Sequence, residues 1–290
     1  MAKKAKKKTA DYESYIASAK PAARMVGAAA AVAASAYKIE VRFLGGLNTA
    51  QKNAFKAAAD RWTKVIVGDL PSVSVDGEVI DDLLILAQGV AIDGPSGILG
   101  QAGPTHVRPA SAGAAAFLPV KGIMSFDTAD LAKMQADGTL KDVITHEMGH
   151  VIGIGTMWTR KGLLKGAGTN NPRFTGKAAK AEFGKLKKSG PMEVPVENQG
   201  GPGTAEGHWR ETVFRNELMS GFIAAPNNPL SRMTVASLQD MGYEVDLTKA
   251  EPYKLPDLFA LAAAGATTTH VHPHALPVIP MTLPDDSVVP

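Results

Sequence analysis

The segment THEMGHVIG, residues 145–153, constrains this chain more than any other, because it places two histidines four residues apart. On an α-helix, positions i and i+4 lie on the same face, so His146 and His150 can reach one metal ion. Glu147 follows the first histidine directly and lies close enough to hold a water molecule bound to that ion. This H-E-x-x-H pattern is typical of zinc hydrolases and predicts a zinc site with Glu147 as general base.

The composition limits which other ligands and partners the chain can use. The 290 residues include no cysteine, which excludes disulfides, thiolate metal sites and cysteine nucleophiles. Metal ligands must therefore be histidine, aspartate or glutamate. The net charge of +3 is too small to imply a polyanionic partner, so we expect no specific binding of nucleic acid. No apolar run reaches the roughly 20 residues that a transmembrane helix needs.

Residues 1–36 form a basic and alanine-rich N-terminal segment with two interpretations. The lysine cluster at its start, the alanine-rich run and an A-x-A-like end are typical of an export signal or a removable pro-segment. Asp11 and Glu13 interrupt this pattern, and alanine makes a poor apolar core for a signal. We therefore favour a solvated basic tail that leads into an alanine-rich helix. The lysines could also contact an acidic surface weakly.

Hydrophobic periodicity predicts a regular first half, residues 37–153. Apolar and polar residues alternate over 37–44, and apolar residues recur at helical spacing after Asn48 or Thr49, either of which could cap a helix. Residues 88–116, which are rich in Gly, Pro, Ala and Ser, are predicted to form a long loop. The expected elements are strands at 37–44, 73–75, 82–87 and 122–127, and helices at 50–67, 128–134 and from 140 to near Gly153.

The second half is predicted to be less regular. Residues 154–256 are rich in Gly, Lys, Pro and Asn, with helices expected near 178–187 and 233–241. Residues 257–290 read as a Pro- and His-containing tail. Its histidines, His270, His272 and His274, alternate and could bind adventitious metal, but we interpret them as part of a plain tail. The whole pattern indicates an α+β fold with helices packed on a mixed sheet.

Two histidines and a glutamate leave a catalytic zinc site one ligand short, because such sites take three protein ligands and a water. A third histidine six residues after His150 would complete it, but that position is Thr156. His208, in the sequence EGHWR, stands alone further along the chain. Eleven residues later (219 − 208) comes Met219 in NELMS, and a methionine turn shortly after the third ligand is the second half of the metzincin pattern.

These motifs together resemble the leishmanolysin family of metzincin metalloproteases, over roughly residues 37–256. In that family an insertion displaces the third zinc histidine, and here His208 follows His150 by 58 residues (208 − 150). The resemblance implies a metzincin-like zincin: a mixed twisted sheet with two long helices in an N-terminal subdomain, 37–153, and a loop-rich C-terminal subdomain, 154–256. The disulfides and the cysteine-type latency of eukaryotic members cannot be carried over.

The resemblance also implies roles for individual residues. His146, His150 and His208 match the ligands of one catalytic Zn²⁺, Glu147 matches the general base, and Met219 matches the Met-turn methionine. The substrate would be a protein or peptide paired with an edge strand, a role that the order of elements assigns to Gly122–Asp127. Residues 221–228 would form a wall of the primed-side pocket.

The leading interpretation is therefore a zinc-dependent endopeptidase. One alternative is a structural or binding protein on a protease-derived fold, whose two tails dock partners. Another is a zinc hydrolase that acts on a non-peptide bond. The resemblance favours a secreted or extracellular location, although the export signal is weak and a cytoplasmic or virion-associated location stays open.

Overall fold

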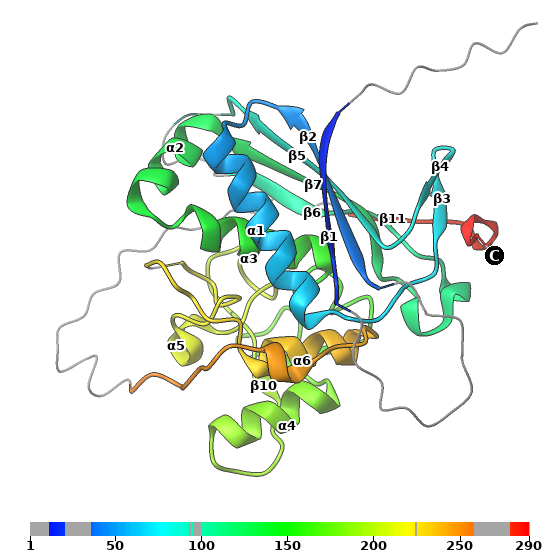
Figure 1. The fold of residues 1–290 in the computed structure, drawn as a ribbon. Coiled ribbons are helices and arrows are strands. Elements are labelled where there is room, and N and C mark those ends of the chain that lie inside the picture. Colours follow the sequence, from blue (N-terminus) through cyan, green and yellow to red (C-terminus); the bar gives the residue numbers. More distant parts are fainter. Residues whose placement is uncertain are drawn as a thin grey trace, which may run out of the picture.

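The computed structural model describes residues 12–20, 36–92, 94, 100–223, 225–257 and 279–289. A six-stranded mixed sheet carries two long helices, and a less regular part of the chain lies below it in Figure 1. The sheet order is β1-β2-β5-β7-β6-β11. The mixed α+β class predicted from the sequence is thus confirmed.

Three parallel strands form the middle of the sheet: β2 (Lys38–Gly45), β5 (Leu83–Val90) and β7 (Pro119–Asp127). On one side β1 (Glu13–Ser18) pairs antiparallel with β2. On the other side β6 (Gly100–Val107) pairs antiparallel with β7, and the short β11 (Met281–Thr282) pairs parallel with the end of β6. The buried middle strands are rich in branched apolar residues, as expected for strands covered on both faces.

Helices α1 (Thr49–Val65) and α3 (Leu140–Ile152) pack against each other over one face of the sheet (Figure 1). Asn48 caps α1 through a reciprocal pair of hydrogen bonds with Gln51. Phe55 of α1 makes edge-to-face contacts with Phe43 of β2 and Phe126 of β7. This packing places α3, the helix with the H-E-x-x-H pattern, between α1 and the sheet edge.

A second apolar cluster covers part of the opposite face. The hairpin of β3 (Val73–Val75) and β4 (Glu78–Ile80) packs there with Leu84, Val120 and Leu283. A 3₁₀ turn, η3 (Asp285–Ser287), follows Leu283. The C-terminal residues are thereby anchored on the sheet.

The remaining elements are short. The first half also contains η1 (Ala110–Ala115) and α2 (Thr128–Asp137). The second half holds a small sheet, β8 (Leu164–Lys165), β9 (Arg173–Phe174) and β10 (Val194–Pro195), together with α4 (Lys177–Leu186), α5 (Glu211–Phe214), α6 (Arg232–Met241) and η2 (Leu247–Lys249). Within the described ranges, no helix is both long and apolar enough to cross a bilayer.

Three predictions about irregular segments were wrong. The 88–116 loop contains β6 and η1, residues 1–36 contain β1, and the 257–290 tail contains β11 and η3. Each of these three strands contains few β-branched residues or is only two residues long. Each forms because a neighbouring strand supplies hydrogen-bond partners. The alanine-rich helix and His270, His272 and His274 lie outside the described residues.

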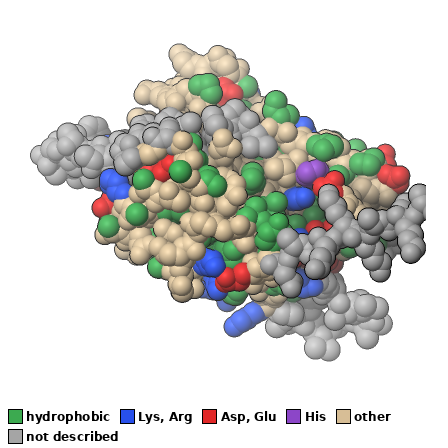
Figure 2. All heavy atoms as spheres, turned by 90° about the horizontal axis from the view of Figure 1, so that it is seen from above, with side chains coloured by type: hydrophobic (Ala, Val, Ile, Leu, Met, Phe, Trp, Pro, Cys, Tyr) green, Lys and Arg blue, Asp and Glu red, His purple; other side chains and the backbone are tan. Residues whose placement is uncertain are grey.

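Charges of both signs are interspersed on the face that Figure 2 shows, where hydrophobic side chains lie between them. This mixture agrees with the small net charge of the sequence.

Candidate metal centre

Helix α3 carries His146, Glu147 and His150, and all three residues are almost completely buried. The side chains of all three are at most 3% exposed. Two hydrogen bonds fix the helix: Trp62 Nε1 of α1 donates to the Thr145 carbonyl at 2.9 Å, and the Tyr243 hydroxyl donates to the Ile152 carbonyl at 2.8 Å. The helix ends at Ile152, near Gly153 as predicted, and Gly153 caps it in a left-handed conformation at φ 118°.

The fold brings His208 to the same point as the two helical histidines. The three Nε2 atoms lie 3.0 Å from one another. One ion can contact all three nitrogens at the 2.0–2.1 Å usual for zinc and histidine. Thr156, at the position of a nearby third ligand, instead donates its hydroxyl hydrogen to the His150 carbonyl at 2.8 Å. The three histidines could therefore hold a metal ion.

Backbone carbonyls determine which ring nitrogen carries the hydrogen in each histidine. His146 Nδ1 lies 2.7 Å from the Leu218 carbonyl, His150 Nδ1 lies 2.9 Å from the Ile154 carbonyl, and His208 Nδ1 lies 2.8 Å from the Thr204 carbonyl. A carbonyl only accepts hydrogen bonds, so each neutral ring keeps its hydrogen on Nδ1. Three Nε2 lone pairs then converge, an arrangement that fits a cation and is unfavourable without one.

Burial keeps these imidazoles neutral. It lowers the pKa of His150 to about 3 and that of His208 to about 4. The pKa of His146 falls well below its usual value for the same reason, and the two neighbouring imidazoles add to the effect. Neutral imidazole is the form that binds a metal, so the site is prepared for one near neutral pH.

Glu147 is the other buried titratable group at this site. Its Oε1 is buried and has no hydrogen-bond partner among the residues that the structure describes. Burial raises the pKa of its carboxyl group to about 8. An unpaired buried carboxyl next to a ligand cluster is costly for folding, which indicates a chemical role.

Met219 packs directly beneath the helix that carries the ligands. A β-carbon added to Gly149 would lie 2.8 Å from the Met219 sulfur and 2.9 Å from the Trp62 ring, so only glycine fits at this position. The buried Glu217 carboxylate holds the turn, because it accepts hydrogen bonds from the Met219 amide at 2.7 Å and from the Ser231 hydroxyl at 2.7 Å. Glu217 thus stabilises the turn that carries Met219.

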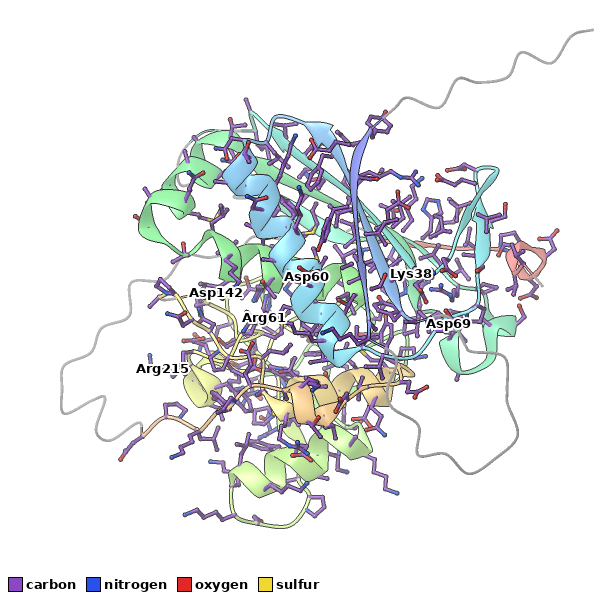
Figure 3. All side chains as sticks on the ribbon, viewed as in Figure 1. Lys38, Asp60, Arg61, Asp69, Asp142 and Arg215 are labelled. Atoms are coloured by element: carbon purple, nitrogen blue, oxygen red, sulfur yellow. The ribbon has the colours of Figure 1, made fainter. Side chains whose placement is uncertain are left out.

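The chain after this turn is tied to both long helices. Arg61 of α1 lies beside Asp142 of α3 (Figure 3), with Nη1 donating to Oδ1 at 3.3 Å. Arg61 Nη2 also donates to the Asn228 carbonyl at 2.6 Å, and the Asn228 amide donates to Asp142 at 3.1 Å. These bonds hold the chain that follows the Met219 turn in a fixed position relative to α3.

Known proteins share this region of the chain. The sequence model of the leishmanolysin family matches residues 114–257, which contain all three histidines, Glu147 and Met219. Leishmanolysin of Leishmania donovani is 29% identical over 142 residues, which are 46% of this chain and 24% of that protein. Leishmanolysin of Leishmania major is 28% identical over 142 residues, 46% of this chain and 23% of that protein.

Over residues 114–257 this chain is leishmanolysin-like. A leishmanolysin-like peptidase of Caenorhabditis briggsae is 41% identical over 66 residues, 22% of this chain and 9% of that protein. The chain spans about a quarter of the length of the leishmania relatives that it matches.

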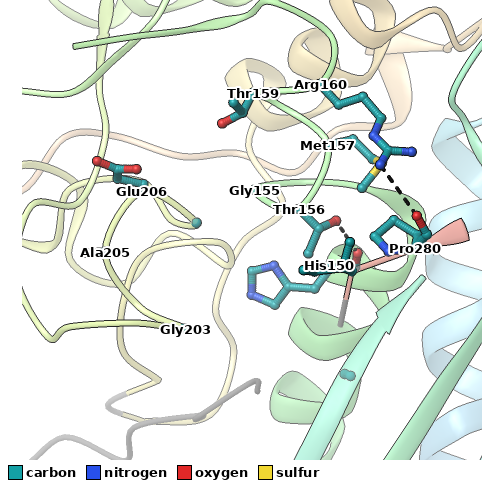
Figure 4. A pocket seen from close by; sticks show the side chains of 13 residues that line it. His150, Gly155, Thr156, Met157, Thr159, Arg160, Gly203, Ala205, Glu206 and Pro280 are labelled. Carbon is teal, nitrogen blue, oxygen red and sulfur yellow. Dashed lines mark hydrogen bonds between the residues drawn. The ribbon is translucent and has the colours of Figure 1, made fainter. Parts of the chain in front are cut away.

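A cavity of about 600 Å³ opens beside His150 in this leishmanolysin-like chain (Figure 4). It reaches from Ala102 on β6 to the segment after α3 and to the loop before His208. Apolar and polar side chains share its walls. Its lining residues are Ala102, His150, Gly155, Thr156, Met157, Thr159, Arg160, Gly203, Ala205, Glu206, Gly207, Ile279 and Pro280.

The strand next to this cavity is not the one predicted to pair with a substrate. Gly122–Asp127 belongs to β7, which lies between β5 and β6 and has no free edge. The assignment was wrong because β6 was predicted to be a loop. Among the described residues, no strand pairs with the outer edge of β6 from Gly100 to Pro104. The role of residues 221–228 as a pocket wall stays a prediction.

Acidification is expected to reduce the stability that the neutral imidazoles contribute to the metal-free protein. Between pH 6.5 and about 4, His150 and His208 would be protonated in the unfolded chain but neutral in the folded one. The unfolded state then binds more protons, so the free energy of unfolding falls as pH falls, by up to about 1.4 kcal/mol per pH unit for each imidazole. Urea unfolding with a chelator at pH 7 and pH 5 measures this. The raised pKa of the Glu147 carboxyl group acts in the opposite direction, so the two proteins are compared. As the pH falls, the free energy of unfolding should fall more in wild type than in a His208→Asn variant, and an equal change in both would contradict the account.

Proposed function

We propose that this chain is a zinc-dependent endopeptidase. The observation that carries the proposal is the convergence of three Nε2 atoms whose Nδ1 atoms all face carbonyl groups. The match of residues 114–257 to the leishmanolysin family model supports the same activity. Zinc, when bound by His146, His150 and His208, would supply Lewis acidity that activates water and polarises the scissile carbonyl.

Glu147 is the general base in this proposal. Its free Oε1 can accept a proton from the attacking water and later deliver it to the leaving amine. Burial raises the pKa of its carboxyl group to about 8, so both the protonated and ionised forms are accessible near neutral pH. Met219 and Gly149 support the ligand helix from below and do not take part in proton transfer.

The substrate is an extended peptide that pairs with β6. The free edge from Gly100 to Pro104 offers backbone groups for strand addition. Ala102 on this edge and His150 line the same cavity, so a paired peptide would run past the metal ligands. In the metzincin arrangement that we propose, residues 37–153 supply four of the six strands of the sheet and the ligand helix, and residues 154–256 supply His208 and Met219 on the other side of the cleft.

Casein cleavage with and without a chelator tests the activity. We expect cleavage that stops when a zinc chelator is added and returns when zinc is restored in excess. Cleavage that ignores the chelator would contradict the zinc mechanism. An absence of cleavage with zinc bound would favour a structural or binding protein, and turnover of esters but not peptides would indicate a hydrolase of another bond.

A further inference from the structure

The C-terminal residues 279–289 return to the candidate cleft although they are distant in sequence from the metal ligands. Ile279 and Pro280 line the cavity that also contains His150. Met281 and Thr282 then pair with His106 and Val107 at the end of β6. This segment therefore covers one part of the β6 edge and leaves the part beside α3 free.

Residues 280–283 are held on one side by Arg160 and on the other by the end of β6. Arg160, which follows α3, donates hydrogen bonds to the Thr282 hydroxyl at 2.8 Å and to the Pro280 carbonyl at 3.4 Å (Figure 4 shows the latter). The Leu283 amide donates to the Val107 carbonyl at 3.0 Å. These bonds fix the segment at the rim of the cavity.

The residues after β11 anchor the segment on the far face of the sheet. Leu283 is only 8% exposed and packs in the second apolar cluster, and Val288 forms a bridge with Val73. By contrast, Ile279 is 88% exposed and Met281 is 59% exposed. The anchor thus lies away from the cavity, and the exposed stretch from Ile279 to Thr282 is the part that meets the cleft.

We propose that residues 279–282 are an end wall of the substrate cleft that determines specificity. They occupy the β6 edge at His106 and Val107, so a peptide can pair only with the stretch from Gly100 to Pro104. This inference rests on the proposed function, which it deepens by naming the substrate class. The preferred substrates are extended peptides with few residues beyond the cleavage site on the side of this wall.

The test compares short and long peptides in the full-length protein. Cleavage sites are first mapped on a library of peptides, and matched peptides are then made with several extra residues at one end or the other. The double variant Arg160→Ala, Leu283→Ala removes the tether and the anchor. Ile80→Ala is the matched control, because it removes apolar volume from the same cluster without altering the wall.

In the double variant we expect kcat/KM for the peptide extended toward the wall to rise about tenfold relative to the short one, the effect of one or two additional backbone hydrogen bonds. The ratio of kcat/KM between extended and short peptides should not change when the peptides are extended at the other end. It should also stay unchanged in the Ile80→Ala control. Faster hydrogen exchange at 281–283 would report release of the segment. Release without a change in the ratio would overturn the proposal.

A second variant, Ile279→Gly with Pro280→Gly, alters the wall at its cavity-facing residues and does not disturb the anchor. This variant should also raise kcat/KM for the extended peptide relative to the short one. The proposal is wrong if neither variant raises this ratio. If the wild-type protein cleaves no peptide, the proposed function fails separately. Fluorescence anisotropy with the same short and long peptides then tests the wall by binding, and equal affinity ratios in wild type and both variants would overturn it.

Discussion

Replacing His208 with alanine is expected to remove zinc from the purified protein and abolish peptide cleavage. Two histidines from one helix would remain, and a catalytic zinc site needs three protein ligands. The affinity for zinc should fall by more than about 100-fold. Loss of a group that only hydrogen-bonds to a metal ligand already lowers metal affinity about 10–100-fold. Metal analysis after gel filtration, together with a casein assay, measures both effects.

His106→Ala is the matched control for this prediction. His106 lies on β6, outside the cluster of three Nε2 atoms, so its replacement should leave the zinc content unchanged. Stoichiometric zinc and full activity in the His208→Ala variant would mean that the third ligand lies elsewhere. Of the three ligands, His208 gives the sharpest test because no local motif accounts for its position.

Replacing Glu147 with glutamine is expected to lower kcat by about 10²–10⁴-fold, the usual contribution of a general acid or base. Glutamine keeps the shape of the side chain but cannot accept the proton from water. The three histidines are untouched, so zinc content should match that of wild type. Steady-state kinetics on a peptide substrate, with metal analysis of the same sample, measure this.

Glu211→Gln is a suitable control because Glu211 is also a buried glutamate. Burial raises the pKa of its carboxyl group to about 7, yet it lies outside the histidine cluster. We expect its replacement to change kcat by no more than a few-fold. Wild-type turnover in Glu147→Gln would exclude Glu147 as the base, and loss of zinc in that variant would point to a structural role instead.

The sequence predicted the elements whose periodicity is long and regular. The apolar residues that recur at helical spacing along α1 and at its C-cap are all at most 1% exposed: Phe55, Ala58, Ala59, Trp62, Val65 and Ile66. Helix α3 begins at Leu140 as expected and ends at Ile152, next to the Gly153 near which its end was predicted. Such elements are predictable because their hydrophobic face and their caps are encoded within a few turns of the chain.

The elements that were missed depend on partners distant in sequence. The strand β6 has the sequence GQAGPTHV, which has little β propensity, and it forms because β7 pairs with it. Missing this strand moved the predicted substrate edge to β7, which is an inner strand. β1 and β11 were missed for the same reason, since one pairs with β2 and the other with the end of β6.

The sequence by itself determined the local part of the metal centre. A four-residue spacing on a helix places His146 and His150 on one face, with Glu147 beside them, because helix geometry is set by local backbone hydrogen bonds. The motif around His208 and the turn at Met219 pointed to the third ligand only through family resemblance.

Only the tertiary structure decided how these groups meet. It brings the three Nε2 atoms to 3.0 Å from one another and places a carbonyl from Leu218, Ile154 or Thr204 at each Nδ1. All three acceptors are backbone atoms in turns, and a backbone carbonyl is present at every residue. No sequence motif can therefore mark them, and their positions follow from packing across the whole domain.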